Sequence, residues 1–486
     1  MSNIGKEQTM KIYNTMTRKK EELNPITPKQ IKMYTCGQTV YNDIHMGNAR
    51  FYVVFDAIRR YLQWKGYEVN FVQNFTDIDD KIITKANEEN TTTEELAERY
   101  IQHTLCDLAE LNVLPATTNP RATEEIPEII VLIQQLIEKG YAYENDGTVY
   151  YEVTKFENYG KLSKKKIEDL EAGKRIEVEA GKRNAHDFVL WKPAKPSEPK
   201  WQSPWGEGRP GWHIECSAMA KKYLGDEIDI HGGAEDLIFP HHENEIAQTE
   251  AATERDFARL WLHCGILTTD HKKISKSRGN FFTFREMTEK FPPDVIRFYL
   301  LSGHYRMQME LNDEVLTAAG QGLQRIKTCH INMQHALSLA PKTETAIDDE
   351  VKCEELFPRT APTHYQVAFE AAMDDDFNTA DAITAIFELV KFANTRLADQ
   401  QQPSQDLIKS MCEQLEKLCE ILGLDLNAAA SNPTTSEDEK IEALISARQE
   451  ARKNKNFAEA DSIRKQLSEM GIILEDTTGG VRWRRG

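Results

Sequence analysis

The sequence lacks long hydrophobic runs. The longest apolar stretches, residues 51–55 and 295–301, are far shorter than the ~20 residues that a membrane-spanning helix needs. Residues 1–22 are mixed and charged, without the apolar segment and small-residue cleavage site of a secretory signal. These absences exclude a membrane protein of the helical type and predict a cytoplasmic location.

Cysteine is also scarce. The chain has 8 cysteines in 486 residues, and no two of them form a Cys-x-x-Cys pair. That number and scatter exclude a disulfide scaffold, a zinc ribbon and a thioredoxin-like motif. Most of the cysteines are therefore predicted to be plain buried thiols.

An overall basic charge is missing too, because the formal net charge is −18. Phosphate contacts need a basic footprint, so the balance argues against a protein that nucleic acid covers on all sides. Basic segments do occur locally, at 161–166, at 448–455 and near the C-terminus. Any nucleic-acid partner would have to be met by such patches.

The first part of the chain alternates strand and helix patterns. Residues 32–36 and 68–74 have strand patterns, and residues 48–64 carry apolar side chains on one face of a helix. This order predicts a parallel sheet of the doubly wound type.

The later parts change in character. A helix at 124–139 and a strand at 148–153 open a segment of short strands and Gly- and Pro-rich loops, which predicts an insertion. Beyond about residue 318 the period is helical, with helices expected at 371–397 and 407–422. A polar linker and a small last module follow.

Two segments suit nucleotide phosphates. His45-Met-Gly-Asn48 precedes a helix, whose first N–H groups attract anions, and Gly47 allows a ligand close to the backbone. Lys273-Ile-Ser-Lys276-Ser lies in a basic stretch that suits a loop over a polyphosphate. Each segment alone fits an ordinary helix start or a solvated basic loop. As a pair they resemble the two nucleotide motifs of class I aminoacyl-tRNA synthetases.

A third set of residues has metal-ligand chemistry. His241 and Glu245 are four residues apart, which places them on one face of a helix. With Cys36 and Cys216 they form a set of N, S and O ligands that zinc accepts in tetrahedral geometry. Taken singly, each cysteine also fits a buried thiol, and His241 a helix-capping histidine.

The segments 34–41, 75–81, 209–217 and 239–245 together resemble the cysteinyl-tRNA synthetase family, and the likeness extends from about residue 12 to residue 485. It implies an α/β fold: a Rossmann-type parallel-sheet catalytic domain with an inserted connective domain, then an all-α helical bundle and a small C-terminal anticodon-binding module. The expected boundaries are 1–118 and 206–268 for the two catalytic halves, 119–205 for the insertion, 269–320 for the Lys-x-Ser-Lys-Ser loop and stem-contact region, 321–427 for the tRNA-binding bundle and 440–486 for the anticodon-binding module.

The resemblance also assigns roles. It implies zinc ligands at Cys36, Cys216, His241 and Glu245, and catalytic residues at His45, Asn48, Lys273 and Lys276. It implies ATP contacts at Gly47, His231, Gly232, Gly233 and Lys276, and a cysteine pocket with Thr76 and Trp212. One departure is Asn48, where class I motifs commonly have a second histidine. An amide donates a hydrogen bond but cannot become cationic, which makes His45 the more important member.

The implied activity is that of a monomeric cysteine–tRNA ligase. L-cysteine would react with ATP, accompanied by Mg²⁺, to give cysteinyl-adenylate and pyrophosphate, and then pass to the 3′ terminal adenosine of the tRNA for cysteine. Packing alone rejects a near-isostere such as serine only about 10²-fold. One zinc ion per chain favours a thiolate, so a separate editing domain becomes unnecessary.

Three alternatives stay open at this point. A ligase that joins cysteine to an amino sugar uses the same core but would lack the long C-terminal region. A simple nucleotidylyltransferase would have no use for the Cys/Cys/His/Glu set. A non-catalytic RNA-binding protein with a structural zinc would leave the Lys-x-Ser-Lys-Ser segment unexplained.

Overall fold

The computed structural model describes residues 9–166, 181–196, 198–269, 272–273, 282–339, 362–399, 403–427, 436–453, 456–477 and 480–485. The chain divides into two compact units, Met1–Leu426 and Asn427–Gly486. In the described ranges, no helix is both long enough and apolar enough to cross a membrane.

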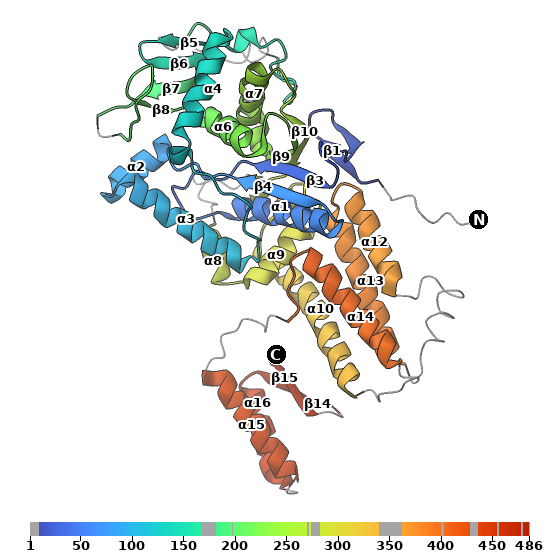
Figure 1. Cartoon of the computed structure of the whole chain (residues 1–486). Helices are drawn as coiled ribbons and strands as arrows, with labels where there is room; N and C mark the ends of the chain where they lie inside the picture. The colour runs from blue at the N-terminus through green and yellow to red at the C-terminus, as the bar shows by residue number, and fades with distance from the viewer. Residues whose placement is uncertain are drawn as a thin grey trace, which may run out of the picture. The chain divides into compact units, whose positions relative to one another are not determined.

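The larger unit is organised around a four-stranded parallel sheet with the order β10-β9-β3-β4. Its strands are β3 (Gln30–Thr35), β4 (Glu68–Gln73), β9 (Ile228–Ala234) and β10 (Ala258–Cys264). Figure 1 shows α1 (Met46–Trp64) on one side of the sheet and α6 (Trp212–Leu224) with α7 (Glu243–Thr253) on the other. The predicted doubly wound sheet is therefore confirmed, and ligands are expected at the carboxyl ends of its strands.

Helix α1 is buried on more sides than its sequence suggests. The predicted apolar face is buried, from Phe51 to Leu62, but Tyr52, Val53 and Ala57 on other faces are buried as well. The reason is that α1 packs against the sheet and also against α9 (Pro293–Leu301) and α14 (Gln405–Ile421). A helix surrounded in this way is held rigidly, and its first turn is therefore a fixed platform for a site.

The insertion consists of one helix against an antiparallel sheet. Helix α4 (Ile126–Glu138) precedes four strands with the order β5-β6-β7-β8. These strands are β5 (Ala142–Asn145), β6 (Thr148–Tyr151), β7 (Phe188–Pro193) and β8 (Gly208–Pro210). The helix and the strand that the sequence predicts here are both present, and α4 also packs on α6 and α7.

After the sheet the chain forms short elements and then a helical bundle. The short elements are β11 (Leu267–Thr269), β12 (Lys272–Lys273), α8 (Phe284–Thr288), α9 and β13 (Met309–Glu310). The bundle contains α10 (Asp313–Leu339), α12 (Pro362–Asp374), α13 (Thr379–Leu397) and α14. Arg297 of α9 holds the bundle on the catalytic core, because it pairs with Asp56 at 2.5 Å and donates to the Leu422 carbonyl at 2.8 Å.

The single helix predicted at 371–397 is wrong, since the chain breaks between α12 and α13. Asp376 and Phe377 have left-handed backbone conformations, with φ of 68° and 49°. The Asp376 carboxylate accepts hydrogen bonds from the backbone N–H of Tyr13, at 2.9 Å, and from Tyr305, at 2.9 Å. Contacts from distant parts of the chain thus override a helical period that continues across the break.

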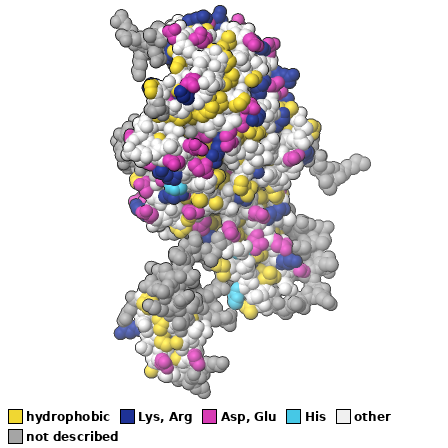
Figure 2. Space-filling model, turned by 60° about the vertical axis from the view of Figure 1, so that its left-hand side comes forward, with side chains coloured by type: hydrophobic (Ala, Val, Ile, Leu, Met, Phe, Trp, Pro, Cys, Tyr) yellow, Lys and Arg dark blue, Asp and Glu magenta, His cyan; other side chains and the backbone are white. Residues whose placement is uncertain are grey.

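The remaining elements are a hairpin, two helices and the C-terminal unit. The hairpin is β1 (Lys11–Asn14) with β2 (Lys19–Glu22), and the helices are α2 (Asp80–Glu89) and α3 (Thr93–Glu110). The unit Asn427–Gly486 contains α15 (Ser436–Lys453), α16 (Phe457–Glu469) and the antiparallel pair β14 (Ile472–Thr477) and β15 (Gly480–Arg485). On the face drawn in Figure 2, basic and acidic side chains are interspersed.

Candidate active site

A cavity of about 290 Å³ lies at the carboxyl end of β3. Its wall comes from the loop after β3, from the first turn of α1 and from the segment 264–267. Of the residues predicted for the site, it is lined by Cys36, His45, Gly47, Asn48 and Trp212. The topology therefore brings the first phosphate motif and a predicted metal ligand to one cavity.

His45 is fixed at the start of α1 by a reciprocal cap. Its Nδ1 accepts a hydrogen bond from the Asn48 backbone N–H at 3.1 Å, and the Asn48 Oδ1 accepts one from the His45 backbone at 3.2 Å. A side chain at Gly47 would clash with this arrangement, because a Cβ there would lie 2.8 Å from the imidazole Cε1 of His45. All three residues thus hold one imidazole beside the positive end of the helix dipole.

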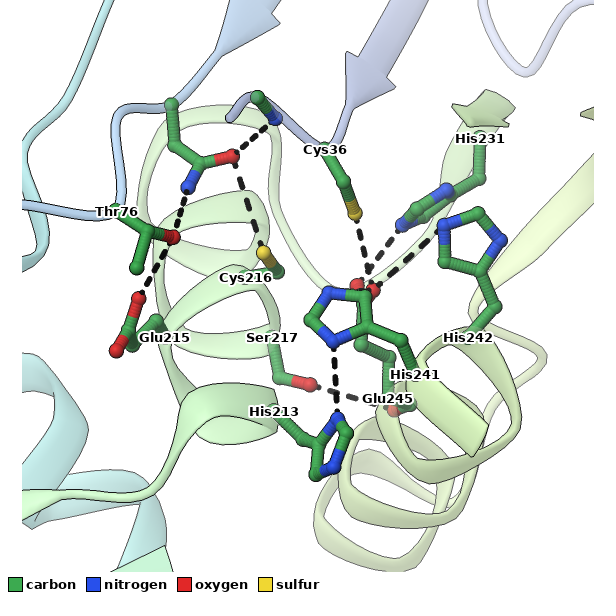
Figure 3. A network of polar contacts seen from close by, with 12 residues as sticks. Cys36, Thr76, His213, Glu215, Cys216, Ser217, His231, His241, His242 and Glu245 are labelled. Atoms are coloured by element: carbon green, nitrogen blue, oxygen red, sulfur yellow. Dashed lines mark hydrogen bonds and ion pairs between the residues drawn. The ribbon is translucent and has the colours of Figure 1, made fainter. Parts of the chain in front are cut away.

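The four predicted metal ligands converge from three parts of the chain (Figure 3). Cys36 follows β3 and Cys216 lies on α6. His241 lies just before α7, and Glu245 lies in the first turn of α7. Their ligand atoms all lie within 4.8 Å of one another, and all four residues are buried. Glu245 Oε1 is 3.1 Å from the Cys36 Sγ and 3.0 Å from the His241 Nε2.

The electrostatics of this cluster suit a divalent cation. A hydrogen bond from Cys36 lowers the pKa of the Cys216 thiol to about 6 despite burial, which favours a thiolate. Burial opposes the charged form of His241, but Glu245 and Cys216 outweigh it and raise the pKa of His241 to about 10. Within the described ranges, the ion-pair partners of Glu245 are histidines only. The donor set of two sulfurs, a nitrogen and a carboxylate oxygen fits zinc.

Comparison with known proteins identifies the family. A family model described as tRNA synthetases class I (C) catalytic domain matches residues 22–321, a DALR domain matches 368–427, and a cysteinyl-tRNA ligase anticodon binding domain matches 434–484. The cysteine–tRNA ligase of Lachnoclostridium phytofermentans is 53% identical over 476 residues, which cover 98% of this chain and 100% of that protein. The chain belongs to the cysteine–tRNA ligase family. The ligase of Lachnospira eligens agrees, with 52% identity over 98% of this chain and 100% of its own length.

Solved structures give the same fold at low identity. Methionyl-tRNA synthetase of Mycobacterium tuberculosis, in complex with methionyl-adenylate, superposes with a TM-score of 0.59 at 16% identity, covering 81% of this chain and 89% of that chain. A leucyl-tRNA synthetase of Agrobacterium radiobacter bound to tRNA gives a TM-score of 0.60 at 12% identity, over 84% and 86% of the two chains. The predicted family, the class I fold and the enzyme class of an aminoacyl-tRNA synthetase are therefore confirmed. The match of an anticodon-binding model also disfavours the amino-sugar ligase.

The structure places the predicted ATP residues of β9 next to the metal cluster. His231 lies against Glu245, with its Nε2 2.9 Å from Oε2, and its ring stacks on Trp261 at a centroid distance of 4.3 Å.

A Cβ on Gly232 would lie 2.2 Å from Phe55, and one on Gly233 would lie 2.4 Å from the ring of His242. None of the three lines the cavity, so their contact with ATP stays a prediction.

His231 also belongs to a second group of converging ligands. Cys36, His231, His242 and Glu245 have ligand atoms that lie within 4.8 Å of one another. This group shares Cys36 and Glu245 with the first. The first group contains Cys216, the thiol whose pKa is lowered. In that group His231 is not a ligand, and its Nε2 contacts the Oε2 of Glu245 instead. We therefore keep Cys36, Cys216, His241 and Glu245 as the metal set.

Of the two predicted cysteine-pocket residues, Trp212 contacts a metal ligand directly and Thr76 contacts the chain neighbour of one. The Trp212 ring covers His241 at a centroid distance of 4.3 Å and is 39% exposed, so it forms a wall of the cavity. Thr76 is buried, and its hydroxyl donates to the carboxyl group of Glu215, the residue before Cys216, at 3.1 Å (Figure 3). Of the two, only Trp212 lines the cavity itself.

The second phosphate motif is only partly described. Lys273 belongs to β12, whose backbone pairs with Thr268 of β11, directly after the segment that lines the cavity. Lys276 lies outside the described residues. The pairing places Lys273 beside the strand that continues from the cavity wall, while the roles of both lysines stay predictions.

Two residues that support the metal set, His213 and Asn74, were not among the predicted site residues, although His213 stands inside the segment 209–217 and Asn74 directly precedes the segment 75–81. His213 Nδ1 lies 2.9 Å from the Nδ1 of His241, and this contact turns the Nε2 of His241 toward Glu245. Asn74 accepts from the Gly37 N–H at 2.9 Å and lies 3.8 Å from the Cys216 sulfur. Such outer contacts orient metal ligands in proteins. His213 sits directly after Trp212 in the sequence, which was the available signal.

Arg50 is a third missed residue, and it connects the helix of the first phosphate motif to the segment 265–266 of the cavity wall. It lies on α1 two residues after Asn48, is fully buried, and has no carboxylate within ion-pair distance among the described residues. Its guanidinium donates instead to five backbone carbonyls, those of Gly265, Ile266, His304, Tyr305 and Met307. Two of these belong to the segment that lines the cavity and leads into β11 and β12.

Replacing Arg50 by lysine is expected to lower the free energy of unfolding by about 2 kcal/mol, because three ammonium donors cannot serve five carbonyls and buried acceptors lose their partners. Urea unfolding measures the change. Arg59→Lys is the matched control, since Arg59 lies on the same helix and donates to a single carbonyl, that of Pro115. The control should change stability by less than about 0.5 kcal/mol. Equal effects of the two substitutions would contradict the account of Arg50.

Proposed function

We propose that this chain is a cysteine–tRNA ligase that activates L-cysteine with ATP to cysteinyl-adenylate, releases pyrophosphate, and transfers the cysteine to the 3′ terminal adenosine of its tRNA. One observation carries the proposal beyond family membership. Two thiols, an imidazole and a carboxylate converge beside a cavity that a capped helix start also lines. A thiol-selecting site and a phosphate site thus share one cavity.

In the activation step, the cysteine carboxylate attacks the α-phosphate of ATP, and negative charge grows on the phosphoryl group and on the departing pyrophosphate. Donors and cations that are already positioned stabilise that charge without reorganisation. His45 and the N–H groups at the start of α1 act on one side of the cavity. Lys273 and Lys276 are the proposed cations of the second phosphate motif, and Mg²⁺ accompanies the ATP.

Cys36, Cys216, His241 and Glu245 are the proposed ligands of zinc, with one zinc ion at this active site in each chain. When bound, it supplies a Lewis acid that prefers a thiolate to a hydroxyl group, which separates cysteine from serine. The chain's residues prepare this site: His213 and His231 orient His241 and Glu245, and Trp212 covers the imidazole of His241 against solvent.

The tRNA is the partner proposed for the unit Asn427–Gly486, which contains the match to the anticodon-binding model. A net charge of −18 means that the phosphates of the tRNA meet local basic groups. The interspersed charges of Figure 2 agree with this. A monomer in the cytoplasm remains the expected state.

Aminoacylation tests the proposed function directly. The purified chain is incubated with ATP, Mg²⁺, labelled cysteine and a transcript of the tRNA for cysteine, and acid-precipitable label is counted. Label should accumulate with cysteine and stay at background with serine or without ATP. A folded, zinc-loaded chain that transfers no cysteine would overturn the proposal in favour of a non-catalytic RNA-binding protein.

A further inference from the structure

A second cluster of metal-type ligands lies inside the helical bundle. It consists of His330 on α10 and of Cys412 and Glu416 on α14, whose ligand atoms all lie within 4.8 Å of one another. The His330 Nε2 is 2.6 Å from the Glu416 Oε1, and the Cys412 Sγ is 3.6 Å from the same oxygen. None of the three residues lines the active-site cavity or belongs to the proposed catalytic zinc set.

Helix geometry explains why these side chains meet. Cys412 and Glu416 are four residues apart on α14, so both project from one face of that helix. Helices α10 and α14 pack against each other, and His330 faces this contact with a side chain that is 1% exposed. Gln334, one turn beyond His330, brings an amide group to within 3.2 Å of the same imidazole nitrogen.

The cluster reaches solvent through a carboxylate whose ion-pair partner, within the described ranges, is a histidine. The Glu416 side chain is 39% exposed, while Cys412 is buried. In the described part of the chain, His330 is the ion-pair partner of Glu416, and no lysine or arginine pairs with it. Burial, together with the neighbouring Glu416, raises the pKa of the Cys412 thiol to about 12. A cation at this point would compensate the carboxylate and favour the thiolate.

We propose that His330, Cys412 and Glu416 form a second metal site, which takes a divalent transition-metal ion of the zinc type. The ligand atoms are the imidazole Nε2, the thiolate Sγ and a carboxylate oxygen, and the Gln334 amide oxygen or water completes the coordination. Binding releases the Cys412 proton to solvent, and no bond between heavy atoms is broken. A sulfur and a nitrogen donor select against Mg²⁺ and Ca²⁺, which prefer oxygen.

The distances require only a small adjustment for such an ion. Bonds of about 2.0–2.3 Å in tetrahedral geometry separate neighbouring ligand atoms by about 3.3–3.8 Å. The distance of 3.6 Å between the Cys412 sulfur and the Glu416 oxygen already lies in this range. The imidazole–carboxylate contact of 2.6 Å must open by about 1 Å, which the partly exposed Glu416 side chain allows.

A metal ion here would connect α10, the first helix of the bundle, to α14, its last helix. The two are separated in the chain by α12 and α13. Ion binding to the folded bundle but not to the unfolded chain raises stability. The site therefore acts on the stability of the bundle. It does not depend on the proposed aminoacylation.

Cobalt titration of the metal-stripped full chain tests the proposal, because thiolate–cobalt absorption reports cysteine ligation directly. The native chain should bind two Co²⁺ ions, and Cys412→Ser should bind one while keeping aminoacylation activity. Cys419→Ser is the matched control, since Cys419 is a buried thiol on the same helix and stands outside the ligand cluster. This control should still bind two ions.

Glu416→Gln provides a second variant that leaves the buried packing intact, because the side chain is partly exposed. It should weaken the second Co²⁺ affinity at least about 10-fold, as the loss of a ligand charge implies. A native chain that binds a single ion would overturn the proposal. An equal loss of the second ion in Cys412→Ser and Cys419→Ser would overturn it as well, since it would show that any buried thiol of α14 has the same effect.

Discussion

Cys216→Ser is expected to lower cysteine-dependent ATP–pyrophosphate exchange by about 10³-fold or more, which corresponds to about 4 kcal/mol of lost transition-state stabilisation. The substitution removes the thiol whose pKa is lowered to about 6, and a serine hydroxyl is not a zinc ligand at neutral pH. The variant should also contain less than stoichiometric zinc by elemental analysis.

Cys264→Ser is the matched control for this variant. Cys264 is buried and lines the same cavity, but it stands outside the metal set. The control should keep both its zinc and its exchange activity within a few-fold of the native chain. A Cys216→Ser variant with full zinc and full exchange would show that the ligand assignment is wrong and would turn attention to the group with His231 and His242.

His45 carries the second large expected effect. His45→Ala should reduce kcat/KM for ATP by about 10²- to 10³-fold, the usual cost of removing a positioned donor to a developing anion. It should also lower the free energy of unfolding by about 1 kcal/mol, because the imidazole Nδ1 caps the N–H of Asn48.

His45→Asn separates these two roles. An asparagine at an N-cap position accepts the same kind of hydrogen bond, so this variant should unfold within about 0.5 kcal/mol of the native chain. The asparagine side chain is shorter than that of histidine and does not place a donor at the same position toward the phosphates. The loss of kcat/KM should therefore persist. Urea unfolding and steady-state exchange on the same preparations give both values. Recovery of activity in His45→Asn would mean that His45 acts only as a cap.

The fold was largely predictable because its signals are local. The alternation of strand and helix patterns before residue 118 gives a parallel sheet, and the apolar period of α14 gives a buried helix. The break between α12 and α13 was not predictable, because Asp376 is held by Tyr13 and Tyr305 from distant segments. The spacing of apolar residues along one segment does not indicate contacts that come from distant segments.

The candidate site shows the same division. Motif resemblance brought together the four metal ligands, which the structure places within 4.8 Å of one another. It could not reveal what the glycines of β9 contact, since Phe55 and His242 arrive from other elements. Arg50 was missed because a charged side chain on a helix usually faces water, whereas here five carbonyls of distant loops satisfy it.

The cluster in the bundle left little trace in the sequence beyond the four-residue spacing of Cys412 and Glu416. Cys412 stands near neither a second cysteine at metal-ligand spacing nor a histidine, and His330 belongs to a helix far away in the chain. Only the packing of α10 on α14 makes them neighbours. Cys412 and Glu416 have the same four-residue spacing as His241 and Glu245, but such a pair is common on helices, and the third ligand here is supplied only by tertiary packing.

If zinc at the cavity selects cysteine, ATP–pyrophosphate exchange with cysteine, serine and alanine will depend on the metal. Each amino acid is assayed with the native chain, with the chain stripped of metal, and with the stripped chain after zinc is restored. The account predicts exchange with cysteine only, its loss on stripping and its return with zinc. Undiminished cysteine exchange in a chain that elemental analysis shows to be free of zinc would contradict it.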